Sequence, residues 1–331
     1  MNDNNPPASW PDRAVGLGAG LAGALLFVVS TRGSSLAMAL AYFTPLPLMI
    51  GAAGFSLPGA FVGSLAGAGV LLASAQAPFA LAFLFGFAAP ALALAAMIQS
   101  PLPSPRRGPA DARFVAPGEM LETIILLSIL VTGAGVALLL VNYHGFEPAM
   151  TAVMQHFAPT LDDFAASLAP VSSEIGAERV KRLAVISAPA GVAASQVMLL
   201  SVNLWLAART IDISGRLRRP WPSLPETLRL PRLLGPIFLV SAGLAFKGGL
   251  IAVLAGIVAA AIGFGFALHG LAAVHGLTRD FELRGAWLAA LYAVAMVLEP
   301  WSILLLALFG VMESAFSLRA RKARRRVKTP S

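Results

Sequence analysis

The chain has 331 residues, of which 57% are hydrophobic and only 12% are charged, and its formal net charge is +8. Ordinary soluble domains carry about 25% charged residues, so this composition excludes a typical soluble protein and indicates a membrane protein. The chain has no cysteine, which excludes disulfides and cysteine nucleophiles. Its basic residues lie between and after apolar segments, a distribution typical of membrane topology rather than of nucleic-acid binding.

The first apolar segment predicts a transmembrane helix over residues 14–30, after a polar segment over residues 1–13 that we expect in the cytoplasm. It contains Gly18, Gly20 and Gly23, which match the dinucleotide-binding pattern G-x-G-x-x-G. That pattern requires a preceding strand and a following acidic residue, and neither is present. We therefore interpret these small residues as a surface for close helix packing.

The second predicted span, residues 36–54, is interrupted by two prolines that remove backbone donors and should kink or break the helix. Broken helices at membrane depth face protein or a cavity. This makes Tyr42 and Thr44 candidates for lining a site, although a proline kink without a ligand is the simpler alternative. The third span, residues 57–73, carries glycines at every fourth position, which predicts a helix-packing face: Gly59, Gly63 and Gly67.

Three further apolar segments predict spans over residues 77–98, 118–141 and 183–208. In the last of these, Gln196 and Asn203 are seven residues apart and lie on one helix face. Amides inside a bilayer need partners, so these two side chains are expected to bond a neighbouring helix or a ligand. Between the fifth and sixth spans, an apolar stripe at helical spacing predicts an amphipathic extracytoplasmic segment over residues 142–182.

The remaining apolar blocks are long enough for more than one crossing. Residues 233–276 are expected to turn at Lys247-Gly248-Gly249, and residues 285–318 form either one span or a hairpin that turns at Glu299-Pro300-Trp301. The hairpin predicts about ten spans (8–10) in an all-α membrane domain over residues 14–318, with both termini cytoplasmic. It places 19 of the 24 lysine and arginine residues in the cytoplasm, as expected for short loops, including the basic loop 209–232 and the tail 319–331.

Several catalytic motifs are missing from the sequence. It contains no G-x-x-x-x-G-K-[ST] phosphate loop, no H-E-x-x-H zinc motif and no G-x-S-x-G nucleophile elbow. The four histidines lack a metal-ligand spacing. We therefore predict a protein that is not an enzyme and that has no cofactor and no metal site.

Two short patterns resemble a known family. Near the C-terminus, Gly310, Glu313, Phe316 and Arg319 place a glycine, an acidic residue, an aromatic residue and an arginine at the end of the last helix. Together with Phe43-Thr44-Pro45-Leu46-Pro47 before a glycine-rich span, this pattern resembles the closing and opening signatures of the YybS-like family of bacterial membrane proteins of unknown function. This chain has Glu313 where that family is expected to have aspartate.

The resemblance implies an inner-membrane protein whose fold is distantly similar to the substrate-binding subunits of energy-coupling-factor transporters. Those subunits bind vitamins and depend on a separate ATPase module, so separate coupling and ATPase subunits are implied as partners. The first functional hypothesis is therefore a protein that binds or transports a small molecule between its helices. Its expected pocket residues are Tyr42, Thr44, Gln196 and Asn203, with Glu299 near the outer mouth.

The second hypothesis is a non-enzymatic structural or regulatory membrane protein. Cytoplasmic or envelope partners would dock on the basic loop 209–232 and on the tail 319–331, which is also expected to contact anionic lipid headgroups. In this hypothesis Glu313 is structural and pairs with Arg284 across the final hairpin, and Arg319 helps to position the last helix.

Overall fold

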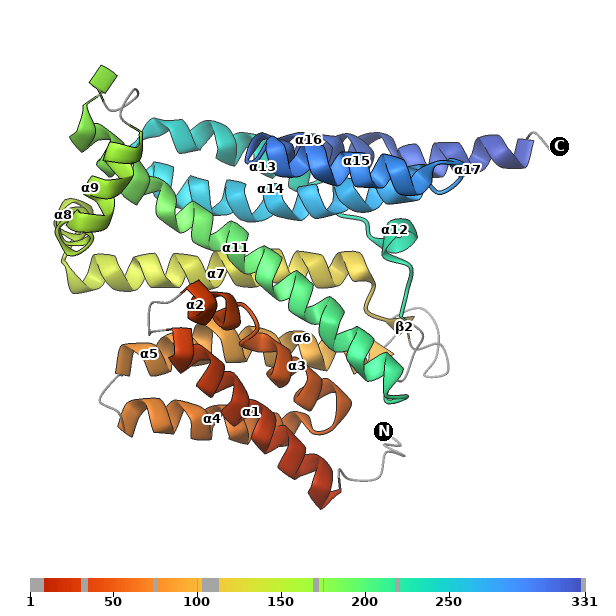
Figure 1. Cartoon of the computed structure of the whole chain (residues 1–331), viewed down its shortest axis with the longest axis horizontal. Helices are drawn as coiled ribbons and strands as arrows, with labels where there is room; N and C mark the ends of the chain where they lie inside the picture. Colours follow the sequence, from red (N-terminus) through yellow and green to blue (C-terminus); the bar gives the residue numbers. More distant parts are fainter. Residues whose placement is uncertain are drawn as a thin grey trace. The chain divides into compact units, whose positions relative to one another are not determined.

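The computed structural model describes residues 9–30, 35–73, 77–99, 101–102, 113–168, 173–174, 176–217 and 221–328. Most of these residues form helices, and the strands are a two-residue antiparallel ladder between β1 (Pro101–Leu102) and β2 (Arg113–Phe114) (Figure 1). The predicted helical fold class is therefore confirmed. Residue contacts divide the chain into two compact units, a division that nothing in the sequence pattern indicates. Unit 1 is Met1–Ile124 with Met198–Thr227, and unit 2 is Ile125–Val197 with Leu228–Ser331.

Two long helices run through both units, α7 (Pro117–Asn142) and α11 (Ala177–Ile213). The other helices of unit 1 follow the predicted apolar segments, and the break in the second segment separates α2 from α3. They are α1 (Trp10–Ser30), α2 (Ser35–Ala41), α3 (Pro45–Gly54), α4 (Leu57–Ala73), α5 (Ala77–Leu81), the π-helix η1 (Ala82–Ala88), α6 (Ala89–Gln99) and the short α12 (Leu224–Thr227).

Helices α1 and α4 approach each other closely because glycines line both sides of their contact. A Cβ on Gly63 would collide with the backbone of Leu17, and a Cβ on Gly59 would lie 2.6 Å from the carbonyl oxygen of Arg13. On the opposite helix, a Cβ on Gly20 would collide with the backbone of Gly63. The glycines of both helices therefore serve backbone approach, and Gly20 lies inside a helix rather than in a phosphate-binding turn.

Unit 2 contains the two hairpins that the sequence predicts. Residues 233–276 are divided at Gly248 and Gly249, which both have positive φ, and the last apolar block turns at residues 298–300. The elements of this unit are α8 (Phe146–His156), α9 (Ala158–Ser167), α13 (Leu234–Leu244), the 3-10 helix η3 (Ala245–Lys247), α14 (Gly249–Leu277), α15 (Arg284–Val297), α16 (Trp301–Phe316) and α17 (Leu318–Lys328).

The segment over residues 142–182 contains two helices, because the chain turns at Phe157 and α9 begins directly after it with a proline in its first turn. Ion pairs connect these helices to the start of α11. Arg182 Nη2 lies 2.7 Å from Glu147 Oε1 of α8, and Lys181 Nζ lies 2.6 Å from Asp162 Oδ1 of α9. The positive charges at the start of α11 therefore hold α8 and α9 at this end of unit 2.

Helix α11 also extends further than its apolar pattern predicts. An ion pair between Arg209 and Asp212, with 2.8 Å between nitrogen and oxygen, lies in its last turns. The helix ends before Gly215, whose φ is +67°, and Arg216 N–H then donates to Ile211 O. The basic loop expected over residues 209–232 therefore begins only after Ile213.

Among the described residues, five helices are long and apolar enough to cross a membrane: Trp10–Val29, Ala77–Gln99, Pro117–Asn142, Ala177–Ile213 and Gly249–Leu277. Five shorter apolar helices accompany them: Ala39–Gly54, Leu57–Ala73, Leu234–Lys247, Arg284–Val297 and Trp301–Phe316. A soluble core does not need five such long apolar helices, so these lengths indicate a membrane protein.

The close approach of α1 and α4 predicts that Gly63→Ala lowers the free energy of unfolding by about 1–3 kcal/mol, because the added methyl group forces the helices apart. The matched control is Gly69→Ala in the same helix. A Cβ at Gly69 meets no atom within 4 Å, so this change should be neutral or stabilising by up to about 1 kcal/mol. Thermal unfolding of both variants in mild detergent, followed by tryptophan fluorescence, checks this; equal melting temperatures would contradict it.

Candidate functional site

The break between α2 and α3 leaves backbone groups that a continuous helix would satisfy. Phe43 N–H donates to Leu40 O, Thr44 N–H donates to Ala41 O, and Leu46 N–H donates to Phe43 O. In an α-helix Leu46 N–H would instead bond Tyr42 O, four residues earlier. The carbonyl of Tyr42 is thus left without a backbone donor.

Asn203 of α11 supplies the missing donor. Its Nδ2 donates to Tyr42 O at 2.7 Å and to Leu199 O of its own helix at 2.7 Å. Both acceptors are carbonyl oxygens, which fixes the orientation of the amide, because only the NH₂ group can donate to them. Two of the predicted site residues, Tyr42 and Asn203, are therefore brought together within unit 1, through the backbone of Tyr42 and not through its ring.

Two polar atoms at this place have no hydrogen-bond partner among the described residues: Asn203 Oδ1 and Thr44 Oγ1. Both residues are buried, with 1% and 0% of their surfaces exposed. Thr44 precedes α3 at the N-cap position, where a hydroxyl usually accepts from the second or third N–H of the helix. Here the third residue is Pro47, which has no N–H, and Leu46 N–H is already bonded.

The break is also packed closely against α1. A Cβ on Gly23 would lie 3.2 Å from Thr44 O and 2.9 Å from Leu48 Cδ1. Since Gly23, Thr44 and Asn203 all belong to unit 1, the arrangement is internal to that unit. It presents one free acceptor and one free hydroxyl among the buried atoms of unit 1.

The other predicted pocket residues lie in unit 2. Gln196 lies two turns before Asn203 on α11 and is half-buried. Glu299 lies in the turn between α15 and α16, where Ser302 Oγ donates to its Oε2 at 3.2 Å. The structure thus brings together three of the five predicted residues, Tyr42, Thr44 and Asn203.

A second polar cluster is buried in unit 2, where α16 ends and α17 begins. Arg319 Nε lies 2.7 Å from Glu313 Oε1, and these side chains are only 7% and 4% exposed. The prediction that Glu313 pairs with Arg284 is therefore wrong. Ser317 ends α16 in the left-handed conformation, with φ of +51°, and the resulting turn brings Arg319 back to Glu313.

Arg319 connects four segments of unit 2. Besides its bond to Glu313, its Nη2 donates to Leu228 O at 2.8 Å and to His269 Nε2 of α14 at 2.7 Å. A guanidinium only donates, so Nε2 of His269 accepts and the ring carries its proton on Nδ1, which is buried without a partner among the described residues. Arg319 therefore belongs to the packed end of unit 2 and not to a free tail.

Sequence reasoning missed His269, because a histidine in an apolar helix gives no sign of its partner. It also missed the loop that closes this cluster. Ser314 Oγ donates to Leu230 O at 3.1 Å, and Arg232 Nε donates to Ser314 O at 3.2 Å. These bonds fix residues 228–232 against the end of α16, so the cluster is well suited to holding helices together.

Over the described part of the chain, no three histidine or carboxylate side chains are grouped in a way that could hold a metal ion. Comparison with protein-family models, curated proteins and solved structures finds no match to this chain. The resemblance to the YybS-like family therefore stays a prediction that rests on the two short sequence patterns.

The buried ion pair predicts that Arg319→Met destabilises the protein by about 3–5 kcal/mol, because it leaves the carboxylate of Glu313 buried without a positive partner. The double variant Glu313→Gln/Arg319→Met should be more stable than the single variant, since no unpaired charge remains. Arg321→Met, at an exposed position of the same helix, is the control and should be close to neutral. Melting temperatures in mild detergent decide the matter, and a double variant less stable than Arg319→Met would refute this account.

Proposed function

We propose that the chain is a multi-pass membrane protein that binds a small molecule carrying a hydrogen-bond donor, beside the break between α2 and α3. The observation that supports this proposal is the pair of buried atoms without partners, Thr44 Oγ1 and Asn203 Oδ1. Buried polar atoms nearly always have a hydrogen-bond partner. Two unpartnered atoms next to a broken helix, in a protein with membrane-length helices, favour a bound molecule that completes their bonds.

The free atoms restrict the chemistry of this molecule. Both hydrogens of Asn203 Nδ2 are used by Tyr42 O and Leu199 O, so the amide can only accept from a ligand. Thr44 can donate one hydrogen bond and accept others. The ligand must therefore supply at least one N–H or O–H group, as amines, amides, alcohols and N-heterocycles do. Neither side chain is charged, so a strongly anionic ligand has no counter-charge from Thr44 or Asn203.

The proposal includes ten spans with both termini in the cytoplasm. Hydrogen bonds within unit 1 support it, because they join segments that this topology assigns to the cytoplasmic side. Arg216 Nη1 lies 3.0 Å from Asp12 Oδ1 and donates to Gly54 O at 3.2 Å, and Gln99 Nε2 donates to Ala53 O at 2.9 Å. The start of the first span and the ends of the second, fourth and sixth thus meet, as alternating crossings require.

Unit 2 supports the same topology independently. Lys322 Nζ donates to Leu277 O at 2.5 Å and lies 3.0 Å from Asp280 Oδ2, while Arg319 bonds Leu228 O. The loop before α13, the end of α14 and the segment after α16 therefore lie at one end of the unit. The resemblance to the YybS-like family adds support for a role in small-molecule uptake, with a separate subunit that supplies energy.

The binding proposal predicts that Thr44→Val reduces ligand-induced stabilisation without harming the unliganded protein, since the hydroxyl has no partner to lose. A panel of small amines, amides, alcohols and N-heterocycles is screened for compounds that raise the melting temperature of the detergent-purified protein. For a compound found this way, the loss of one buried hydrogen bond should make the free energy of binding less favourable by about 0.5–1.5 kcal/mol. This corresponds to roughly two- to twelvefold weaker binding.

Thr132→Val is the matched control, because Thr132 Oγ1 is also buried without a partner among the described residues but lies in unit 2. This variant should keep the ligand response. Asn203→Ala should lose the response and also destabilise the unliganded protein, because it leaves Tyr42 O without a donor. If Thr44→Val and Asn203→Ala both respond like the unchanged protein, or if no compound of the panel stabilises it, the assignment fails.

The topology predicts that a reporter fused after Ser223 is cytoplasmic and that one fused after Lys247 is on the opposite side. Activities of alkaline phosphatase and green fluorescent protein fusions at both positions measure this directly. A phosphatase-active fusion after Ser223 would overturn the ten-span arrangement.

A further inference from the structure

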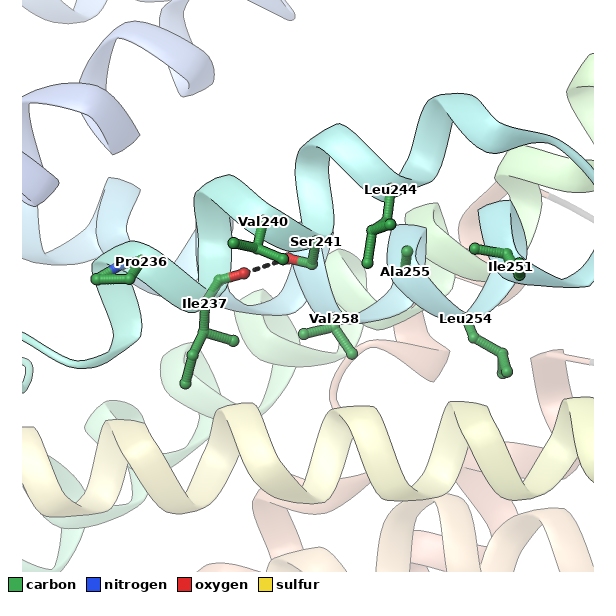
Figure 2. A pocket seen from close by; sticks show the side chains of 9 residues that line it. All are labelled: Pro236, Ile237, Val240, Ser241, Leu244, Ile251, Leu254, Ala255 and Val258. Atoms are coloured by element: carbon green, nitrogen blue, oxygen red, sulfur yellow. Dashed lines mark hydrogen bonds between the residues drawn. The ribbon is translucent and has the colours of Figure 1, made fainter.

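An open apolar groove runs between α13 and α14 in unit 2 (Figure 2). Nine residues line it and its volume is about 530 Å³. Both helices belong to unit 2, so this feature is separate from the proposed ligand site in unit 1. Most of the lining consists of branched aliphatic side chains: Ile237, Val240, Leu244, Ile251, Leu254 and Val258.

The groove offers almost nothing to a polar molecule. The one polar side chain in its lining is Ser241, whose hydroxyl donates within its own helix, to Ile237 O at 2.8 Å and Phe238 O at 3.0 Å. A polar ligand would lose its hydrogen bonds with water and gain none in return. A hydrocarbon chain loses nothing by the same transfer, so the lining selects an apolar occupant.

The groove is open along one side and is short enough to lie within one leaflet. Val240, Ile251 and Leu254 on its rim are 63%, 57% and 45% exposed. From Ile237 to Leu244 helix α13 rises by about 10 Å at 1.5 Å per residue. Half of a hydrocarbon core of about 30 Å is roughly 15 Å, so one lipid chain can follow the groove without leaving its leaflet.

A positive charge marks one end of the groove. Leu244 and Ile251 flank the turn that joins the two helices, and Lys247 lies in that turn with an exposed side chain. The side chain of the adjacent Phe246 is 92% exposed. Along the helix axis, the apolar groove is followed by a cation. This is the same order as the acyl chain and the phosphate of a phospholipid.

We propose that the groove between α13 and α14 is a specific site for one acyl chain of an anionic phospholipid, whose phosphate pairs with Lys247. The apolar lining selects the chain, and the single charge selects an anionic headgroup over a zwitterionic one. In the proposed topology this lipid belongs to the outer leaflet.

Native mass spectrometry of the delipidated full chain in detergent tests the site. Dioleoyl phosphatidylglycerol is titrated first, and dioleoyl phosphatidylcholine is the neutral comparison. The unchanged protein should retain one phosphatidylglycerol per chain at collision energies that remove further lipids. Ala255→Phe fills the floor of the groove and Val240→Trp covers it from the rim. Each variant should bind the retained lipid at least tenfold more weakly. Lys247→Gln should abolish the preference for phosphatidylglycerol over phosphatidylcholine.

Ala286→Phe, at an exposed position of α15, adds the same bulk away from the groove and should leave lipid binding unchanged. Two different groove variants keep the test informative if one of them fails to fold. The proposal is overturned if both groove variants retain the lipid as the unchanged protein does, or if all lipids leave together as an unspecific shell. It is also overturned if the groove variants change the fraction of dimer but leave the amount of retained lipid unchanged, since a second copy of the chain would then occupy the groove.

Discussion

A backbone carbonyl inside a bilayer must find its donor within the protein, and this constraint explains the side-chain hydrogen bonds at the breaks and ends of helices. Where a helix is broken or ends, a side chain from another segment donates to the exposed carbonyl. Asn203 donates to Tyr42 O, Arg216 to Gly54 O, and Lys322 to Leu277 O. The helical parts satisfy themselves, so the polar side chains concentrate at the interruptions.

The same constraint gives the basic residues a second role. Arginine and lysine in the predicted cytoplasmic segments set the expected orientation in the membrane, and several of them also bond the last carbonyls of helices. The negative end of the helix dipole favours a cation at these places. Arg319 is the most buried example, because Glu313 neutralises its charge while its remaining donors bond Leu228 O and His269. Removing its charge therefore affects folding as well as orientation.

Hydropathy and helix-breaking residues predict the helices well, because each of these signals acts within one segment. The prolines at 45 and 47, the Lys-Gly-Gly turn and the Glu-Pro-Trp turn all separate helices where expected. The partner of Glu313 was not predictable in this way. In a continuous helix residues 313 and 319 lie on different faces, and only the left-handed turn at Ser317 brings them together. The bond of His269 and the division of the chain into two units depend on contacts between distant segments, which periodicity does not report.

The two unpartnered atoms beside the break between α2 and α3, Thr44 Oγ1 and Asn203 Oδ1, do not carry equal weight for function. Tyr42 O lacks a backbone donor, and the carboxamide of Asn203 supplies one without a charge, while its second hydrogen bonds Leu199 O of its own helix. The fold therefore accounts for an asparagine at position 203. Its free Oδ1 is present because the amide group is needed as a donor, so this atom says little about a ligand. Thr44 has no such explanation, since its hydroxyl caps no helix and bonds no carbonyl. Valine has nearly the same shape and would avoid the free energy of burying an unpaired hydroxyl, about 1–3 kcal/mol. The hydroxyl of Thr44, more than the amide of Asn203, is what the fold alone does not account for.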